Sequence, residues 1–465
     1  MNAKLTSKIF DKTLFNLRSV WQQINILNSD HPKLKPDLPD TDIVLLKQQM
    51  QDCLKGKGGN VSARARAARL GEAYLCLNDI GRLRFLNLLA QDFGVDNERI
   101  KQLAEEILSS ETEELGKLHQ QMRNTLRPAG LELLMQFNSL PSGVKFLVDM
   151  RADLHRLGGR NNATLKELDK SLKDLLRSWF DVGFLDLVRL SWSTPAAILE
   201  KLIRYEAVHK IRSWSDLKNR LQMDRRCFAF FHPRMPDEPL IFVQVALVKE
   251  LSDNIQKLLD EDAPLEDPFE ANTAIFYSIT NAQSGLAGVG FGDFLIKRVV
   301  ADLKAELPNV KTFSTLSPIP DLRKWMDGKG EKELLLPSER QALRKLEKFT
   351  TLAETLNTAD WHLNETLATA LQKPLMRIAA DYLVNAKQRN RALDLVANFH
   401  LNNGARLERI NWLADTSSKG IRESAGMMVN YLYELKDIEV NHEIYRDSAR
   451  TTAAGSIQSL LKKTK

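Results

Sequence analysis

The chain has 465 residues, of which 43% are hydrophobic and 27% are charged, a balance typical of globular proteins. Its net charge of +6 is small for this length, which argues against a nucleic-acid-binding surface. No window approaches about 18 consecutive apolar residues, and no apolar core follows the first residues, so neither a membrane span nor a secretory signal is expected. The three cysteines form no CxxC pair, which favours a reducing compartment over a structural zinc site. The sequence therefore predicts a cytoplasmic protein that binds neither nucleic acid nor membrane.

Residues 1–174 are expected to form an all-helical domain. Three prolines within 32–39 lack the backbone N–H that a helix needs, so this segment is predicted to be a linker. A helical pattern of apolar residues covers 63–92. Thr164 and Glu167 have the spacing of a capping box, which predicts a helix capped by Thr164. Further helices are expected from residue 97, over 111–127, and from a turn at 140–143 to residue 157.

This helical domain contains no grouping of acids, histidines or cysteines that would build a reactive site. The basic run of Arg64, Arg66 and Arg69 is interpreted as a solvated helix face. A helical domain without such a grouping usually packs, regulates or oligomerises, and we expect this one to assemble subunits and to take no part in chemistry.

Residues 175–465 are predicted to form a second domain of mixed strands and helices. Strands are expected from Arg225, in the segment RCFAFF, and over Leu240–Val248, whose nearly continuous apolar run is typical of a central strand buried on both faces. Strands flanked by helices indicate an α/β or α+β catalytic domain. The sequence also predicts a helical insert over 338–387, two strands or strand edges over 396–403 and 405–412, and a helix over 420–435.

The most informative stretch is 273–320. A short run rich in aromatic and β-branched residues predicts a strand over 273–279, and a glycine-rich turn follows. Apolar residues at helical spacing predict a helix over 294–307, and a second strand over 310–316 stops at Ser317. Glycines let a ligand approach the backbone closely, and the first N–H groups of a helix are unpaired, so this turn is suited to a pyrophosphate.

The surroundings of this turn narrow the choice of ligand. A dinucleotide-binding unit would place an acidic residue after the next strand, where this chain has TLSPIP, and a P-loop would need Gly-Lys-Ser/Thr, which is absent. The spacing resembles the coenzyme A loop of the N-acetyltransferase-like (GNAT) fold, in which an opening between two strands holds the pantetheine. Two departures are Ala287, where those enzymes usually have Arg or Gln, and Asp293, which places a negative charge near the proposed phosphates.

Most of residues 170–435 resembles bacterial-type members of the malonyl-CoA decarboxylase family. The segments that carry this resemblance are LRSWFDVGFLDL, RRCFAFFHPRMPDEPLIFVQVAL, FYSITNAQSGLAGVGFGDFLIKRVV, FSTLSPIP, VANFHLNNGARLERINWLAD and GMMVNYLYEL. The resemblance implies a helical oligomerisation domain over 1–174 and a GNAT-like catalytic domain over 175–465, which together form an α+β protein. It also implies a lyase of fatty acid metabolism that releases CO2 from malonyl-CoA to leave acetyl-CoA, without a metal or cofactor.

The resemblance assigns roles to particular residues. Ser317 and His400 match the catalytic serine and histidine, and Tyr433 matches the tyrosine near them. Loss of CO2 leaves an enolate, whose oxygen needs hydrogen-bond donors and whose carbon needs a proton, which histidine is suited to deliver near neutral pH. The serine is expected to act by hydrogen bonding, because decarboxylation needs no acyl-enzyme. The segment that matches the coenzyme A loop consists of Ala287, Gly288, Val289, Gly290, Phe291, Gly292 and Asp293.

Without the resemblance, plainer interpretations of the three catalytic candidates would prevail. Ser317 would be a turn residue before a proline, His400 a buried structural histidine, and Tyr433 a core residue on a helix. Two other functions also remain open. A GNAT acyltransferase would need an acceptor amine, and a coenzyme A-sensing scaffold would bind malonyl-CoA and leave it intact.

Overall fold

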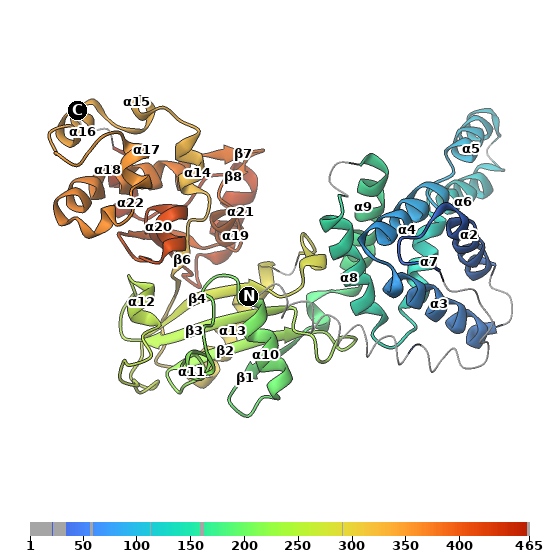
Figure 1. The fold of residues 1–465 in the computed structure, drawn as a ribbon, viewed down its shortest axis with the longest axis horizontal. Helices are drawn as coiled ribbons and strands as arrows, with labels where there is room; N and C mark the ends of the chain where they lie inside the picture. Colours follow the sequence, from blue (N-terminus) through green and yellow to red (C-terminus); the bar gives the residue numbers. More distant parts are fainter. Residues whose placement is uncertain are drawn as a thin grey trace. The chain divides into compact units, whose positions relative to one another are not determined.

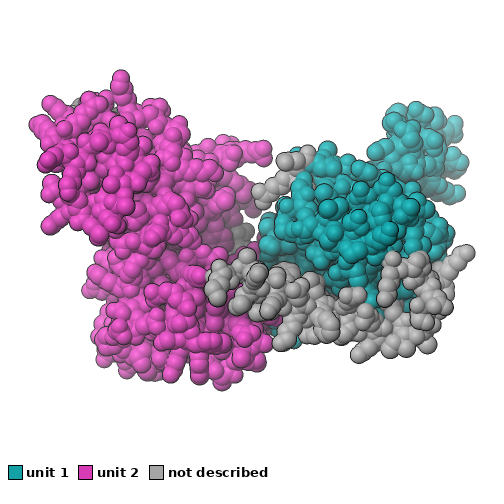
Figure 2. Space-filling model, in the orientation of Figure 1, with its two compact units in different colours: residues 1–184, 232–238, 283–289 teal, residues 185–231, 239–282, 290–465 magenta. Residues whose placement is uncertain are grey.

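The computed structural model describes residue 21 and residues 34–55, 59–111, 113–158, 162–290 and 292–462. The chain divides into two compact units (Figure 2). The helical unit comprises residues 1–184, 232–238 and 283–289, and the sheet unit comprises 185–231, 239–282 and 290–465. The carboxyl-terminal half therefore contributes two short segments to the helical unit.

The described secondary structure of the helical unit is almost entirely helical, as the sequence predicts. Its core includes an aromatic group in which the ring of Phe146 lies 4.8 Å from that of Phe137 and 5.6 Å from that of Tyr74, measured between centroids. The α-helices are α2 (Asp40–Leu54), α3 (Gly59–Cys76), α4 (Asp79–Asp92), α5 (Asn97–Ser109), α6 (Leu115–Thr125), α7 (Ala129–Phe137), α8 (Gly143–Arg156) and α9 (Ala163–Trp179).

Two expectations for these helices are wrong in detail. The helical pattern over 63–92 belongs to two helices, because Asn78 caps α4 by accepting a hydrogen bond from the N–H of Gly81. The cap of α9 is Asn162 rather than Thr164, since the Asn162 side chain accepts the N–H of Thr164 at 3.0 Å. In both cases a short asparagine side chain satisfies the first unpaired N–H groups of the helix.

The sheet unit contains an eight-stranded mixed sheet in the order β1-β2-β3-β4-β5-β10-β6, with β9 paired to β10. Among the described strands of this sheet, β4 and β5 pair in parallel and the other ladders are antiparallel. The expected α+β class is therefore confirmed. The strands are β1 (Asp186–Leu190), β2 (Arg225–Phe231), β3 (Ile241–Val248), β4 (Thr273–Asn281), β5 (Thr312–Thr315), β6 (Ser317–Pro318), β9 (Arg406–Asn411) and β10 (Met428–Leu432), and β7 (Lys387–Gln388) and β8 (Arg391–Ala392) form a separate pair.

In Figure 1 the helices of the carboxyl-terminal part, coloured orange and red, gather at the edge of the sheet where β6 lies. Predicted strands over 225–231 and 240–248 appear as β2 and β3, and β3 is buried along nearly its whole length. The helices are α10 (Ala196–Tyr205), α11 (Trp214–Asn219), α12 (Ile255–Leu258), α13 (Gly292–Glu306), α14 (Leu322–Asp327), α15 (Glu331–Leu334), α16 (Pro337–Leu343), α17 (Leu352–Asn357), α18 (Glu365–Asn385), α19 (Leu395–Asn402), α20 (Ser418–Ser424), α21 (Ile438–Ser448) and α22 (Gly455–Leu461). No helix in the described part of the chain is long and apolar enough to cross a membrane.

The parallel strands β4 and β5 separate partway along their length. Their pairing ends where Phe276 lies opposite Thr315, and the N–H of Leu316 still bonds the carbonyl of Phe276. β4 continues to Asn281 as a partner of β3, with an irregularity in register near its middle. The segment that follows β5 turns away from β4, because Ser317 pairs with β10 instead. This separation puts Ser317 at the point where two neighbouring strands diverge.

Two predicted elements near the carboxyl terminus are wrong. Residues 396–403 form helix α19 rather than a strand, because Asp394 caps the helix and Gly404, at φ +77°, ends it. The predicted helix over 420–435 stops at Ser424. Gly426 adopts a left-handed conformation at φ +77°, and the chain continues as β10.

Candidate active site

Ser317 is the first residue of β6, where it pairs with β10, and it is buried, with 6% of its surface exposed. Its hydroxyl donates a hydrogen bond to the Thr315 hydroxyl at 2.8 Å. The Thr315 oxygen also accepts the backbone N–H of Tyr431 at 3.2 Å. Alternation along a strand places residues 315 and 317 on one face. Thr315 therefore fixes the serine side chain, and it is a site residue that the sequence reasoning missed.

His400 lies on α19, facing the serine. Its Nε2 is 3.0 Å from the Ser317 hydroxyl, and its Nδ1 is 2.8 Å from the hydroxyl of Tyr433. Tyr433 directly follows β10 and is held to β5, because its N–H donates to the Phe313 carbonyl. The structure thus brings the three predicted catalytic residues into one buried hydrogen-bonded array from three separate elements.

Tyr431 completes the surroundings of the imidazole. Its ring stacks on that of His400, with centroids 4.5 Å apart and planes 24° apart. Its hydroxyl is buried and has no hydrogen-bond partner among the described residues. Tyr431 and Tyr433 alternate with Leu432 at the spacing of a strand, a signal that the predicted helix over 420–435 hides. Tyr431 is the second site residue missed by the sequence reasoning.

Burial keeps this array uncharged. It lowers the pKa of His400 to about 3, and no charged group in the described part of the chain contributes to that shift. It also raises the pKa of Tyr433 well above its usual value. At neutral pH the site therefore holds a neutral imidazole, whose two nitrogens comprise one donor and one acceptor. One consistent arrangement has Nε2–H donating to Ser317 and the Tyr433 hydroxyl donating to Nδ1.

The position of the histidine depends on the buried cap of its helix. A carboxylate oxygen of Asp394 accepts the N–H of Ala397 at 2.8 Å, and the Tyr382 hydroxyl lies 3.5 Å from the other oxygen. Burial raises the pKa of Asp394 to about 6. The cap and the imidazole thus share a poorly solvated part of the sheet unit.

The predicted coenzyme A loop is divided between the two units. Residues 283–289 belong to the helical unit, and the chain re-enters the sheet unit at Gly290, just before α13. Ala287, Gly288 and Gly290 are exposed, whereas Val289 is buried. Phe291 and the side chain of Asp293 lie outside the described residues, and Gly292 is the first residue of α13.

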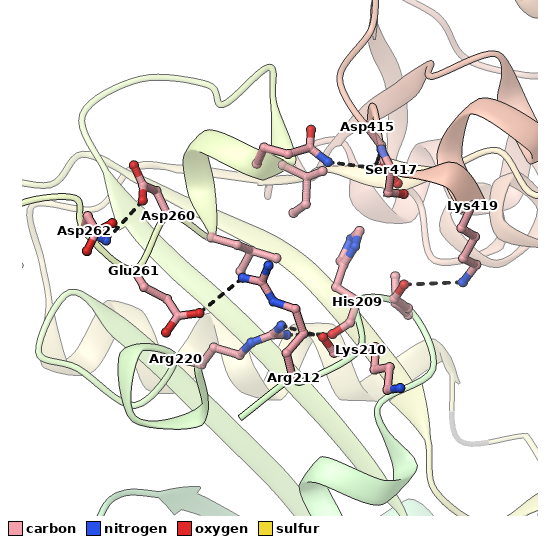
Figure 3. Close-up of a pocket in the computed structure, with 14 residues that line it drawn as sticks. His209, Lys210, Arg212, Arg220, Asp260, Glu261, Asp262, Asp415, Ser417 and Lys419 are labelled. Atoms are coloured by element: carbon pink, nitrogen blue, oxygen red, sulfur yellow. Dashed lines mark hydrogen bonds and ion pairs between the residues drawn. The ribbon is translucent and has the colours of Figure 1, made fainter. Parts of the chain in front are cut away.

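A cavity of about 690 Å³ lies elsewhere in the sheet unit (Figure 3). At its wall, burial lowers the pKa of His209 to about 4, and the Nε2 of this residue is buried without a partner among the described residues. None of the predicted catalytic or loop residues lines this cavity. Its charges balance, since they come from Lys210, Arg212, Arg220, Lys419, Asp260, Glu261, Asp262 and Asp415. Because basic and acidic side chains are equal in number, the charge of this cavity favours neither anionic nor cationic ligands.

Metal ligation would need several side chains of the right kind close together. Among the described residues no group of three or more histidines, cysteines or carboxylates is placed to hold a metal ion. The buried array itself contains hydroxyl and imidazole groups.

Comparison with known proteins gives concordant matches to both halves of the chain. A family model described as the malonyl-CoA decarboxylase C-terminal domain matches residues 183–465, and one described as the malonyl-CoA decarboxylase N-terminal domain matches residues 93–180. Proteins named mitochondrial malonyl-CoA decarboxylase from Anser anser anser and Rattus norvegicus are each 40% identical over 401 residues. These alignments cover 82% of this chain and 80% and 82% of the relatives.

Solved structures give the same result. The crystal structure of malonyl-CoA decarboxylase from Rhodopseudomonas palustris is 41% identical and superposes with a TM-score of 0.82, over 90% of this chain and 99% of that one. The structure from Agrobacterium vitis is 38% identical, with a TM-score of 0.81, over 90% of this chain and 100% of that one. The similarity therefore extends across both units rather than over a single motif.

Proposed function

The chain belongs to the malonyl-CoA decarboxylase family, and from this premise we propose how its buried array carries out the reaction. The activity is that of a carboxy-lyase, which converts malonyl-CoA to acetyl-CoA and CO2. The acyltransferase alternative is not favoured, because the matches in family, sequence and structure are all to decarboxylases.

The reaction sets two demands on the site. When the bond between the carboxylate carbon and the α-carbon breaks, its electron pair passes to the α-carbon and the thioester oxygen as an enolate. The enolate oxygen needs preorganised donors, and the α-carbon must take up one proton. The whole conversion therefore consumes one proton for each CO2 released.

His400 is proposed to supply that proton. Burial keeps its imidazole neutral, and the described protein offers no nearby negative charge to offset the desolvation. The malonyl carboxylate would bring such a charge, and an opposite charge within about 4–6 Å favours the protonated form. In this mechanism His400 takes up a proton as the substrate binds. It then transfers the proton from Nε2 to the α-carbon once CO2 has left.

Ser317 and Tyr433 are proposed to position the reacting groups. The serine hydroxyl would hydrogen-bond to the malonyl group or the thioester oxygen, and Thr315 holds it in place. The Tyr433 hydroxyl would orient the imidazole through Nδ1. The single observation that carries this mechanism is the continuous array from Ser317 through His400 to Tyr433, with contacts of 3.0 and 2.8 Å.

Coenzyme A is proposed to bind along a GNAT-like path. The loop from Ala287 to Asp293 would hold the pyrophosphate, and the pantetheine would pass where β4 and β5 separate. This proposal is supported by the exposure of Gly288 and Gly290 and by the end of strand pairing at Phe276.

Self-association is proposed for residues 1–174, giving a cytoplasmic homotetramer whose catalytic domain spans 175–465. The support is the helical character of the amino-terminal part, and its described residues contain no metal-binding group of histidines, cysteines or carboxylates. A truncated chain that begins at Leu175 should lose its oligomeric order and its solubility, because it exposes an apolar face. Light scattering tests this idea, and a monomeric full-length protein would contradict it.

One assay tests the activity directly. Purified protein is mixed with malonyl-CoA, without an acceptor or added cofactor, and the thioester is followed by mass spectrometry. Conversion to acetyl-CoA is expected. Intact malonyl-CoA would favour a binding protein, and transfer of the acyl group only when an amine is added would favour an acyltransferase.

A further inference from the structure

The segment of the proposed coenzyme A loop in the helical unit is fixed by a buried arginine. Arg151 on α8 is 2% exposed, and its Nη1 donates to the carbonyls of Gly285, at 2.6 Å, and Ala287, at 2.9 Å. Its Nε donates to Asp169 on α9 at 2.8 Å. A buried charge is tolerated when it is paired and hydrogen-bonded, and both conditions are met here. The guanidinium therefore ties two helices to the loop.

Packing reinforces this link. A side chain added at Gly285 would place its Cβ 1.8 Å from the carbonyl oxygen of Val148 on α8, a separation that no real contact reaches. Glycine is therefore needed at position 285 because two backbone segments pack closely there, which is a different reason from the approach of a ligand. The residues just before the loop are thus packed tightly against α8.

The orientation of the loop leaves the N–H of Gly288 available. A trans peptide points its N–H opposite to its carbonyl, so the bond from Arg151 to the Ala287 carbonyl turns the N–H of Gly288 away from the arginine. Gly288 is exposed, and its N–H has no acceptor among the described residues. Its φ of +73° is a left-handed conformation that favours glycine. An exposed and oriented donor of this kind suits an anion.

The ammonium group of Lys173 lies close to Gly288. The Nζ of Lys173 on α9 lies 3.2 Å from the place where a Cβ on Gly288 would be. Lys173 is half-buried and makes no ion pair with any described carboxylate. The ammonium group therefore lies beside Gly288, the residue that carries the exposed N–H.

We propose that Lys173 and the Gly288 N–H bind the pyrophosphate of coenzyme A, and that Arg151 is the positioning residue that keeps the loop in its binding shape. This inference rests on the proposed function, since it takes coenzyme A as the ligand of the loop. It also revises the expectation for the helical domain, which on this reading supplies a substrate-binding residue.

The test compares two substrates that differ in their phosphates. Malonyl-CoA carries the pyrophosphate, and malonyl-pantetheine lacks it. Loss of a hydrogen bond to a charged group corresponds to about 10- to 100-fold in affinity, so Lys173→Gln should raise KM for malonyl-CoA by about that factor and leave kcat nearly unchanged. With malonyl-pantetheine, the variant should match the wild type. Lys170→Gln, on an exposed position of the same helix, is the control and should change neither constant.

Arg151→Lys tests the positioning role separately. A lysine keeps the charge but cannot span Asp169 and two carbonyls, because its ammonium is a compact donor rather than a fork. The variant should raise KM for malonyl-CoA but not for malonyl-pantetheine, whereas a general folding defect would affect both substrates. Circular dichroism and the yield of folded protein accompany the measurement.

The outcomes separate this inference from the activity itself. If the wild type releases no CO2 from malonyl-CoA, the proposed function fails. If the wild type is active but Lys173→Gln keeps the wild-type KM, the inference is overturned and the function stands. An equal loss of kcat/KM on both substrates would likewise overturn it, because the effect would then not depend on phosphate.

Discussion

Arg151 in the helical unit and His400 in the sheet unit are both buried ionisable side chains, but the first is paired with a counter-charge and the second is not. In the helical unit, Arg151 is charged and meets its counter-charge inside the protein, since Asp169 lies 2.8 Å away. In the sheet unit, His400 is surrounded by hydroxyl groups and an aromatic ring, and burial alone lowers its pKa to about 3. A paired charge fixes a shape, whereas an unpaired imidazole can change its charge when a substrate arrives. The predictions below test this contrast.

The largest effect is expected from removing the reacting groups of the sheet unit. His400→Asn cannot deliver a proton at neutral pH, and turnover should fall by about 10²- to 10⁴-fold. Ser317→Ala deletes one oriented hydroxyl, and turnover should fall by about 10²- to 10³-fold. Steady-state kinetics with malonyl-CoA measures both losses, and both variants should still bind coenzyme A.

The double variant shows whether the two groups act as one. If they do, it should be little worse than the worse single variant, because such effects are not additive. The pH profile of kcat should lose its alkaline fall in His400→Asn, since that fall reports loss of the proton donor. His119→Asn, at an exposed position in the helical unit, is the control. Near wild-type turnover in His400→Asn would contradict the mechanism.

A smaller effect is expected at the loop. Nothing lies within 4 Å of a Cβ built on Gly290, so Gly290→Val should fold normally. Its branched side chain would obstruct the phosphates, and KM for malonyl-CoA should rise by about 10- to 100-fold, as for loss of a hydrogen bond to a charged group. An unchanged KM in the folded variant would remove this part of the loop from the site.

The unpaired imidazole also predicts how stability depends on pH. In the folded protein the pKa of His400 is about 3, below the ordinary histidine value of 6.5, so acid favours the unfolded state between these values. Acidification from pH 7.5 to 4.5 should therefore destabilise the region by about 2–3 kcal/mol through His400. Asp394 acts in the opposite sense, because its folded pKa is raised to about 6 and acid then favours the folded state.

The two contributions are separated by a variant that keeps only one of them. His400→Asn retains the Asp394 contribution, so its stability relative to the wild type should improve by about 2–3 kcal/mol between pH 7.5 and 4.5. Hydrogen exchange of the α19 amides, compared between the two proteins at each pH, measures this difference. If the stability difference between the two proteins stays constant across that pH range, burial does not lower the pKa of His400 and this prediction is contradicted.

The buried Tyr431 hydroxyl, which has no partner among the described residues, predicts a change in stability of about 1 kcal/mol. Tyr431→Phe removes a buried group without a partner and keeps the stacked ring, so stability should stay level or rise by about 1 kcal/mol. Tyr431→Leu loses the ring pair, which is worth about 0.5–1.5 kcal/mol, and should lower turnover as the imidazole loses its orientation. Thermal unfolding and kinetics on the two variants separate the ring from the hydroxyl. Equal turnover in both would show that the stacking has no role.

The smallest expected effect is the uptake of a proton when the substrate binds. If His400 becomes charged when malonyl-CoA binds, binding should take up about one proton near neutral pH. Calorimetry with the slow Ser317→Ala variant, in two buffers of different ionisation enthalpy, measures this uptake. Coenzyme A without the malonyl group is the control and should take up none at His400.

Sequence reasoning succeeded where the local pattern agrees with the fold. The apolar run from Thr273 and the amphipathic pattern after the glycine turn appear as β4 and α13. It failed for α19, where Val396 and Phe399 suggest a strand and the cap at Asp394 decides for a helix. Resemblance supplied Ser317, His400 and Tyr433, and the structure brings them together.

The residues that were missed share one physical cause. Thr315 and Tyr431 have no unusual local sequence, and they matter because β5 and β10 meet in space. The sequence analysis likewise assigns no role to Arg151 or Lys173, because their partners lie more than 100 residues away along the chain. Contacts of this range depend on tertiary structure and leave no periodic trace in the sequence.

The two short segments that the carboxyl-terminal half contributes to the helical unit have a consequence for biosynthesis. Residues 283–289 pack on α8 through Gly285 and Arg151, although roughly 100 residues separate them from the last helix of that unit. Ribosomes add about 5–20 residues each second, so the nascent amino-terminal helices wait about 5–20 s before their final piece emerges. During that interval Arg151 has Asp169 but not the loop carbonyls. Synthesis of the sheet unit is therefore a condition for finishing the helical one, and a chain cut between them would release an incomplete product from each side.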